Sequence, residues 1–290
     1  MKRTWKDIYL NKISIPFWIV HTLPLVLIPI AGLSLSGFVA TGVIYVLGMF
    51  FVTAGYHRYF SHRSFKTSRW FQLFLAIGAQ ITSQKGVLWW AANHRHHHKH
   101  SDMPTDAHSA KLHGFWWSHI GWFLSNEFRK TDLKQVSDLA KFKELVWLNH
   151  PIWNFLPPVA YAFLIQMTLG TWGLAYCCFL PLVLIFHGTF TINSLAHLFG
   201  SRRYETKDES KNNFWLALIT LGEGWHNNHH HYQSSCRQGF RSHELDLTYY
   251  VLYALSKLGV VWDLKSPPRH VVEDRPSDQV LALKARKKAA

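Results

Sequence analysis

Histidine is concentrated in three short segments of this chain. The sequence has 290 residues and 20 His, and the segments read His57-Arg-Tyr-Phe-Ser-His62, His94-Arg-His-His-His98 and His226-Asn-Asn-His-His230. On an α-helix, positions i, i+3 and i+4 project from one face. The second and third segments therefore each predict three imidazoles on one face of a helix. Neutral imidazole binds iron, copper, zinc and nickel, so these spacings favour metal binding.

The first segment needs a different explanation, because its two histidines are five residues apart. On an ideal α-helix they would point about 140° away from each other, so we expect the helix to end between them. A fourth element, Asn193 and His197, has the spacing i, i+4 of one helix face. Nine imidazoles are too many for one metal, whereas two metals with four or five nitrogen ligands each would accommodate them. The candidate ligands are His57, His62, His94, His97, His98, His197, His226, His229 and His230.

The other histidines are interpreted as ordinary side chains, hydrogen-bonded within the fold or exposed to solvent, because a lone His has many such roles. This interpretation covers His21, His108, His113, His119, His150, His187, His243 and His270. His96, His100 and His231 adjoin the clusters but fall off the shared faces, so we expect supporting or surface roles for them. Three Cys, two of them adjacent, exclude a disulfide framework and a four-cysteine metal site.

Two long stretches contain no Asp, Glu, Lys or Arg. They cover residues 13–56 and 145–201. A bilayer crossing takes about 20 apolar residues, so each stretch predicts two crossings and a turn, at Gly32–Gly37 and at Gly170–Gly173. The alternative is a large soluble helical protein, but soluble helices usually have a polar face and these stretches have none. The predicted transmembrane helices cover about 14–32, 37–56, 153–170 and 173–195.

The basic residues predict the orientation. If both turns face outward, the segments 1–12, 57–144 and 202–290 lie inside and hold 4, 13 and 14 of the 31 Lys and Arg. Such an excess marks cytoplasmic segments, so we expect the termini and the histidine clusters on the cytoplasmic side. The uncharged stretch Trp70–Gln84 is too short to span and predicts a helix at the membrane interface or beneath the cytoplasmic part. The expected organisation is one all-α domain over 1–290, with a cytosolic cap from 57–152 and 196–270 and a basic tail over 271–290.

The three segments resemble the histidine boxes of membrane fatty acid desaturases, HxxxxH, HxxHH and HxxHH. Asn193-Ser-Leu-Ala-His-Leu-Phe-Gly200 and Gly222-Glu-Gly-Trp-His-Asn-Asn-His-His230 are similar to the acyl-CoA Δ9 (stearoyl-CoA) branch, over roughly residues 10 to 265. The resemblance implies four transmembrane helices and a cytosolic cap that holds two irons, with O2 as co-substrate. The nine histidines would be the ligands, and Asn193 would hold a metal through water.

The resemblance also implies a substrate, a saturated long-chain acyl thioester that receives a cis double bond at Δ9. Gln84, Trp90 and Thr189 match residues that line the kink of the family's acyl tunnel. Two positions depart from the vertebrate members, which have Arg-Asp where this chain has Ala92-Asn93 and Arg-Lys where it has Asn126-Glu127. The resemblance implies CoA as the acyl carrier. Because this chain lacks the Arg-Asp that contacts CoA in the vertebrate members, acyl carrier protein and phospholipid stay open as carriers.

The electron donor is expected to be a separate protein. The His-Pro-Gly-Gly string of a fused cytochrome b5 domain is absent, so the resemblance implies the bacterial type, in the inner membrane, with a ferredoxin, a cytochrome b5-like protein or a reductase as partner. No nucleic-acid partner is expected. Removing hydrogen from an unactivated methylene pair needs a redox metal and O2, which excludes zinc. The alternatives are a related di-iron hydroxylase, ketolase or alkane monooxygenase, and a metal-handling membrane protein, whose site should lie near the bilayer midplane.

Overall fold

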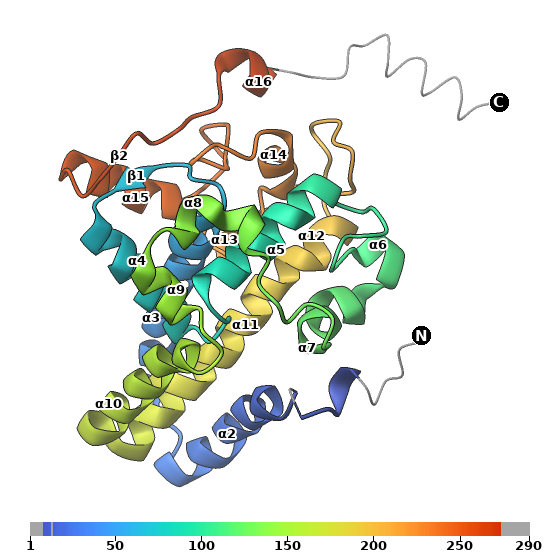
Figure 1. Ribbon diagram of the computed structural model, residues 1–290. Helices are drawn as coiled ribbons and strands as arrows, with labels where there is room; N and C mark the ends of the chain where they lie inside the picture. Colours follow the sequence, from blue (N-terminus) through green and yellow to red (C-terminus); the bar gives the residue numbers. More distant parts are fainter. Residues whose placement is uncertain (1–7, 13, 274–290) are drawn as a thin grey trace.

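The computed structural model describes residues 8–12 and 14–273, and this part of the chain is mostly helical (Figure 1). Its two short strands form one antiparallel pair, in which Lys66 lies opposite Trp262 and Thr67 opposite Val261. The predicted predominance of helix is therefore confirmed. The predicted basic tail lies outside the described residues, except for 271–273.

Apolar helical segments occupy the four stretches for which spans were predicted. The second of them reaches Ser61, past the predicted end at residue 56. Gly32, between the first two, has φ 80°, a conformation that glycine adopts without strain. The segments are α2 (Ile15–Ala31), α3 (Leu35–Phe50) continued by the π-helical η1 (Phe51–Ser61), α10 (Leu156–Gly173), and the π-helical η5 (Leu174–Phe179) continued by α11 (Leu180–Asn193).

In the described part of the chain, two helical runs are long and apolar enough to cross a membrane, Leu35–Ser61 and Trp153–Leu198, and α2 is a shorter apolar helix. The second run is interrupted at Gly170, where φ is 60° and ψ is −150°. The Tyr161 hydroxyl donates to the Cys177 carbonyl at 2.8 Å, although a straight helix would separate two residues 16 apart by about 24 Å. The run is therefore a hairpin, with its turn where the sequence predicted one.

The rest of the described chain forms shorter elements. α4 (Arg69–Ile81) confirms the predicted helix; it buries Leu75 and Ala79 and exposes Trp70 and Phe74. The others are α5 (Val87–His100), α6 (Ala110–His113), η2 (Trp117–Gly121), α7 (Trp122–Leu124), η3 (Leu133–Val136), α8 (Ser137–Ala140), α9 (Lys143–Leu148), η4 (Trp153–Phe155), α12 (Leu195–Leu198), α13 (Phe214–Ile219), α14 (His226–His231), α15 (Leu247–Lys257), α16 (Arg269–Glu273), β1 (Lys66–Thr67) and β2 (Val261–Trp262).

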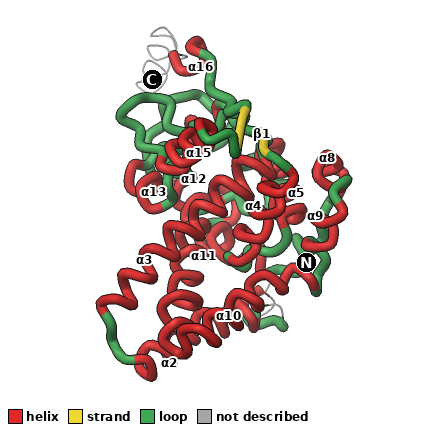
Figure 2. Tube along the Cα trace, turned by 90° about the vertical axis from the view of Figure 1, so that its left-hand side faces the viewer, coloured by secondary structure: helices red, strands yellow, loops and turns green. Residues whose placement is uncertain are grey.

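The apolar helices α2 and α10 lie at the opposite end of the molecule from α12, which bears His197 (Figure 1). Figures 1 and 2 show α2 and α10 at one end, below as drawn, and α12, α13 and α15 toward the other. α3 and α11 pack against each other. Large apolar side chains of the lower helices are exposed, among them Leu25 at 74% and Met167 at 69%. Many exposed large apolar side chains on neighbouring helices are typical of a membrane-contacting protein.

Candidate metal centre

The nine predicted histidines meet in two adjacent groups, which the sequence did not distinguish. Within each group, one nitrogen from every histidine lies within 4.8 Å of the others. The groups adjoin, since the rings of His98 and His230 are 4.4 Å apart. We call them the pentad, formed by His57, His62, His94, His98 and His229, and the tetrad, formed by His97, His197, His226 and His230.

The first box comes together through a π-helical turn. In a π-helix the hydrogen bonds join residues i and i+5, and the His62 N–H donates to the His57 carbonyl at 3.2 Å. The two rings consequently lie 4.8 Å apart. The helix does end between the two histidines, at Ser61. The π-helical geometry, however, was not predicted from the sequence.

Arg95, an intervening residue of the second box, fastens α5 to the end of η1. Its guanidinium donates to the carbonyls of Phe60 and Ser61, each at 2.8 Å. These charge-assisted bonds satisfy carbonyls at the helix end. They hold the two helices so that the Nε2 atoms of His62 and His94 are 2.8 Å apart.

The two asparagines of the third box hold α14 in place. Asn228 donates to the Glu244 carboxylate at 2.9 Å and accepts from the Asn212 amide at 2.7 Å. Asn227 accepts from the Tyr204 N–H at 2.8 Å. Both asparagines are fully buried. Since buried amides need these partners, α14 cannot rotate without breaking them, and its three candidate ligands stay in the two groups.

The nitrogen atoms are arranged as a cation site would require. The Nε2 atom of His94 lies 2.8 Å from that of His62 and 3.0 Å from that of His98. Two nitrogens bound at right angles to one metal ion, each at about 2.1 Å, are about 3.0 Å apart. In the tetrad, the buried Nε2 atoms of His97 and His230 have no hydrogen-bond partner. A buried polar atom without a partner is costly, so a bound cation fits both groups.

Four acidic residues lie beside the Nδ1 atoms of these histidines, and their role was not predicted from the sequence. Each carboxylate approaches an Nδ1 atom, which leaves Nε2 free for a metal, as carboxylates behind metal-binding histidines commonly do. The only sequence signal was proximity, because Asp102 and Asp106 follow the second box and Glu223 precedes the third. The pairs are His97–Asp106 at 3.0 Å, His230–Asp208 at 2.6 Å, His197–Asp102 at 3.7 Å and His57–Glu223.

Burial keeps several of these imidazoles neutral. It lowers the pKa of His98 and of His226 well below the ordinary value of 6.5, and neighbouring imidazoles act in the same direction. His97 differs, because burial acts to lower its pKa but the Asp106 carboxylate overrides burial and raises it. Burial lowers the pKa of His230 to about 4, although Asp208 opposes it. Neutral imidazole is the form that coordinates a metal.

A cavity of about 540 Å³ reaches the candidate ligands. This volume lies within the range of about 300–1,000 Å³ that small-molecule sites occupy. His94 of the pentad lines it, and so does Asn193, which belongs to neither histidine group. The three predicted substrate residues, Gln84, Trp90 and Thr189, also line it.

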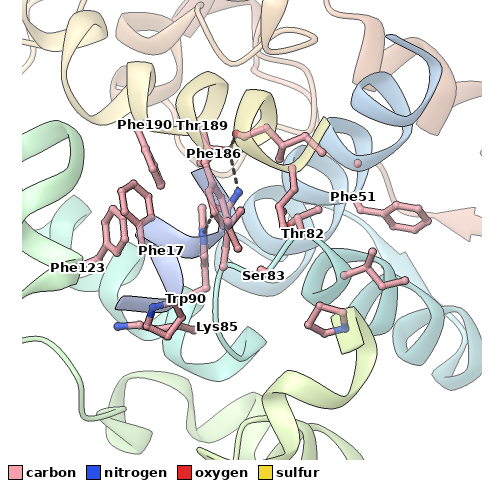
Figure 3. Close-up of a pocket in the computed structure, with 18 of the residues that line it drawn as sticks. Phe17, Phe51, Thr82, Ser83, Lys85, Trp90, Phe123, Phe186, Thr189 and Phe190 are labelled. Carbon is pink, nitrogen blue, oxygen red and sulfur yellow. Dashed lines mark hydrogen bonds between the residues drawn. The ribbon is translucent and has the colours of Figure 1, made fainter. Parts of the chain in front are cut away.

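The predicted substrate residues form a hydrogen-bonded chain in the cavity wall. The Gln84 amide donates to the Thr189 hydroxyl at 2.9 Å, and the Trp90 indole donates to the Gln84 carbonyl oxygen at 3.3 Å. The Trp90 ring stacks on His94, with centroids 4.9 Å apart. Figure 3 shows that aromatic side chains make up much of the remaining wall. An apolar ligand here would lie close to the pentad.

Three histidines interpreted as ordinary prove to be connected. His21 and His187 contact each other through Nε2 atoms at 3.1 Å, and the other nitrogen of His187 lies 3.0 Å from His119. His119 in turn contacts the Ser194 hydroxyl at 2.9 Å. His108, interpreted in the same way, lines the cavity. These residues come from distant parts of the chain, so spacing along the sequence could not reveal their contacts.

Comparison with known proteins identifies the family. The model of the fatty acid desaturase family matches residues 35–261, well over half of the chain. The chain belongs to the fatty acid desaturase family. The relatives described below include proteins named as desaturases, and desaturases are oxidoreductases. This chain is therefore an oxidoreductase. The resemblance that the histidine boxes indicated is confirmed.

Several desaturase relatives cover most of this chain. The "sn-1 stearoyl-lipid 9-desaturase" of Synechocystis sp. is 40% identical over 226 residues, 77% of this chain and 70% of that protein. The "Hex-5-enoyl-(acyl-carrier protein) acetylenase" of Moorena producens is 33% identical over 263 residues, 84% and 81% of the two chains. The "Delta-9 acyl-lipid desaturase 2" of Arabidopsis thaliana is 33% identical over 270 residues, 91% and 85% of the two chains. This chain is therefore Δ9-desaturase-like.

Proposed function

We propose that this desaturase is an O2-dependent di-iron enzyme that introduces a cis double bond at Δ9 into a saturated long-chain acyl substrate. One observation carries the proposal. Two adjacent groups of buried and half-buried histidines adjoin an apolar cavity, and His94 belongs to both the pentad and the cavity wall. Redox metals and an acyl chain would thus be brought within reach of each other.

The nine histidines would hold two irons, one in the pentad and one in the tetrad, and Asn193 would hold a metal through water. When bound, the irons would supply the activation of O2 that removes two hydrogens from neighbouring methylenes, with two electrons from the alkyl chain and two from a donor protein. The histidines bind and tune the metals, and the four carboxylates orient the imidazole rings. The chain's own residues need not act as acid or base on carbon.

The cavity would position the substrate. Burying each CH2 group contributes about 0.8 kcal/mol, so a long chain binds strongly to this apolar wall. The hydrogen-bonded chain of Gln84, Trp90 and Thr189 would bend the substrate and select which carbon pair lies beside His94. The aromatic wall also excludes water from the reacting carbons.

We further propose a single domain with four transmembrane helices, formed by α2, by α3 with η1, by α10, and by η5 with α11. The excess of Lys and Arg in the segments outside these helices supports a cytoplasmic cap. The bacterial inner membrane is the proposed location. A separate ferredoxin, cytochrome b5-like protein or reductase would deliver electrons. The expected acyl carrier is CoA. Relatives named for lipid and for acyl-carrier-protein substrates keep phospholipid and acyl carrier protein open as well.

The decisive test is expression in a host that lacks unsaturated fatty acids, with the double-bond positions of its lipids determined by mass spectrometry. We expect cis-Δ9 products that require O2. Membranes supplied with acyl-CoA or lipid-linked substrate would then identify the carrier. Hydroxylated acyl products instead of alkenes would favour the hydroxylase or monooxygenase alternative. Metal uptake that survives loss of the box histidines would favour a metal-handling protein.

A further inference from the structure

Lys85 places a buried cation in the wall of the apolar cavity. Its ammonium nitrogen is buried and has no hydrogen-bond partner, and it lies 3.9 Å from the centre of the Trp89 ring. Figure 3 shows Lys85 among the lining residues, together with Trp90 and Thr189. A buried ammonium is strongly disfavoured unless it is paired, and a cation–π contact compensates only part of that cost.

The backbone around Lys85 is also held in an unfavourable conformation. Lys85 has φ 68° and Ser83 has φ 56°, values in the left-handed region that residues other than glycine rarely adopt. The Tyr56 hydroxyl donates to the Lys85 carbonyl at 2.5 Å and holds it there. Such conformations persist where the surroundings enforce them, and they cluster at ligand sites.

No residue in the cavity wall offers Lys85 a negative charge. Among the described residues that line it, none is Asp or Glu, and Lys85 is the one Lys or Arg. Burial and, to a smaller extent, the Arg129 guanidinium lower the pKa of Lys85 to about 7. The cavity therefore has one uncompensated positive group in a wall that otherwise suits an alkyl chain.

We propose that Lys85 is a subsite for an anionic oxygen at the polar end of the acyl substrate. The matching ligand is a long alkyl chain with a carboxylate or phosphate within a few bonds of the acyl carbonyl. The phosphates of CoA lie a whole pantetheine arm from its thioester, so a lipid-like phosphate or a free carboxylate reaches Lys85 more directly. The subsite rests on the proposed function only in taking an acyl chain as the occupant of the cavity.

The test measures binding to the purified full-length protein, with four probes of equal chain length. These are palmitate, 1-palmitoyl-lysophosphatidate, palmitoyl-CoA and uncharged hexadecanol. We expect palmitate or lysophosphatidate to bind about tenfold or more tightly than hexadecanol, as a charge-assisted hydrogen bond predicts. Preference for the phosphate probe points to a lipid, and preference for palmitate to a free acid. Equal binding of all four probes, or preference for palmitoyl-CoA alone, would overturn the proposal.

Variants locate the effect. Lys85→Met should abolish the preference for anions but keep hexadecanol binding, and Lys85→Arg should restore part of the preference. Lys141→Met is the matched control, because Lys141 also lies over an aromatic ring, that of Phe142 at 5.3 Å, but is exposed outside the cavity. An anion preference that persists in Lys85→Met rejects the subsite. Anion binding without desaturation would instead reject the proposed reaction and leave the subsite standing.

Discussion

The pentad and the tetrad contain the same type of ligand but differ in the charge behind it. Three tetrad histidines face carboxylates, those of Asp102, Asp106 and Asp208. The pentad has one such carboxylate, Glu223, which also pairs with the buried Arg58 at 3.1 Å. Negative charge behind an imidazole raises its basicity, so we expect the tetrad to bind its metal more tightly.

The two groups also differ in their surroundings. Three of the four tetrad histidines are buried, but only two of the five in the pentad are. The pentad includes His94, which lines the cavity and stacks on Trp90. The comparison leads us to propose a division of roles, in which one group would retain its metal firmly and the other would present its metal to the substrate.

Removing one ligand from each group should produce the largest effect. His97→Ala in the tetrad and His229→Ala in the pentad should each abolish desaturation, because each breaks one metal site. Metal analysis of the purified variants should give about one ion per chain in place of two. Both variants should remain in the membrane fraction. Desaturation by either variant would reject the ligand role of that histidine.

Asp208→Asn should change metal binding in one histidine group and not in the other. Loss of the carboxylate behind His230 should weaken metal binding at the tetrad about 10–100-fold and leave the pentad unchanged. Titration with a chelator, followed by metal analysis, would measure this. Asp263→Asn serves as the control, since Asp263 forms an exposed ion pair with Lys66 at 2.7 Å. Equal weakening at both groups would contradict the division of roles.

Thr189→Val should act on the substrate and not on the metals. Loss of the Gln84–Thr189 hydrogen bond should change the double-bond position or chain-length profile several-fold, while metal content stays at the wild-type level. Product analysis by mass spectrometry is the measurement. Thr191→Val is the control, because Thr191 lies on the same helix but not among the cavity-lining residues. An unchanged profile would count against the tunnel assignment.

The smallest expected effect is the pH dependence of anion binding at Lys85. Its folded pKa of about 7 is depressed, so the ammonium is charged below that pH and neutral above it. The preference for palmitate over hexadecanol should fall a few-fold as pH rises from about 6 to about 8. Arg129 is the charged neighbour that acts on Lys85. A preference that is constant over this range would contradict this expectation, and Lys85→Arg should show none of the decline.

The sequence predicted the positions that could bind metal but not how they divide. Spacing put His94, His97 and His98 on one helix face, yet His97 belongs to the tetrad and its two neighbours to the pentad. The division depends on which helices approach α5, and that is set by contacts such as Arg95 with the end of η1. Lys85 carried no local signal at all, because its significance comes from the cavity around it.

The features that could be predicted from the sequence depend on residues that lie close together in the chain. The absence of charge over residues 13–56 and 145–201 and the glycine at position 170 are local properties, so the sequence determined the apolar helices, the hairpin turn and the set of candidate ligands. Only the tertiary structure decided which carboxylates stand behind them, how the π-helical turn joins His57 to His62, and where the cavity meets His94. These features depend on contacts between residues far apart in the chain, and such contacts have no period or spacing in the sequence.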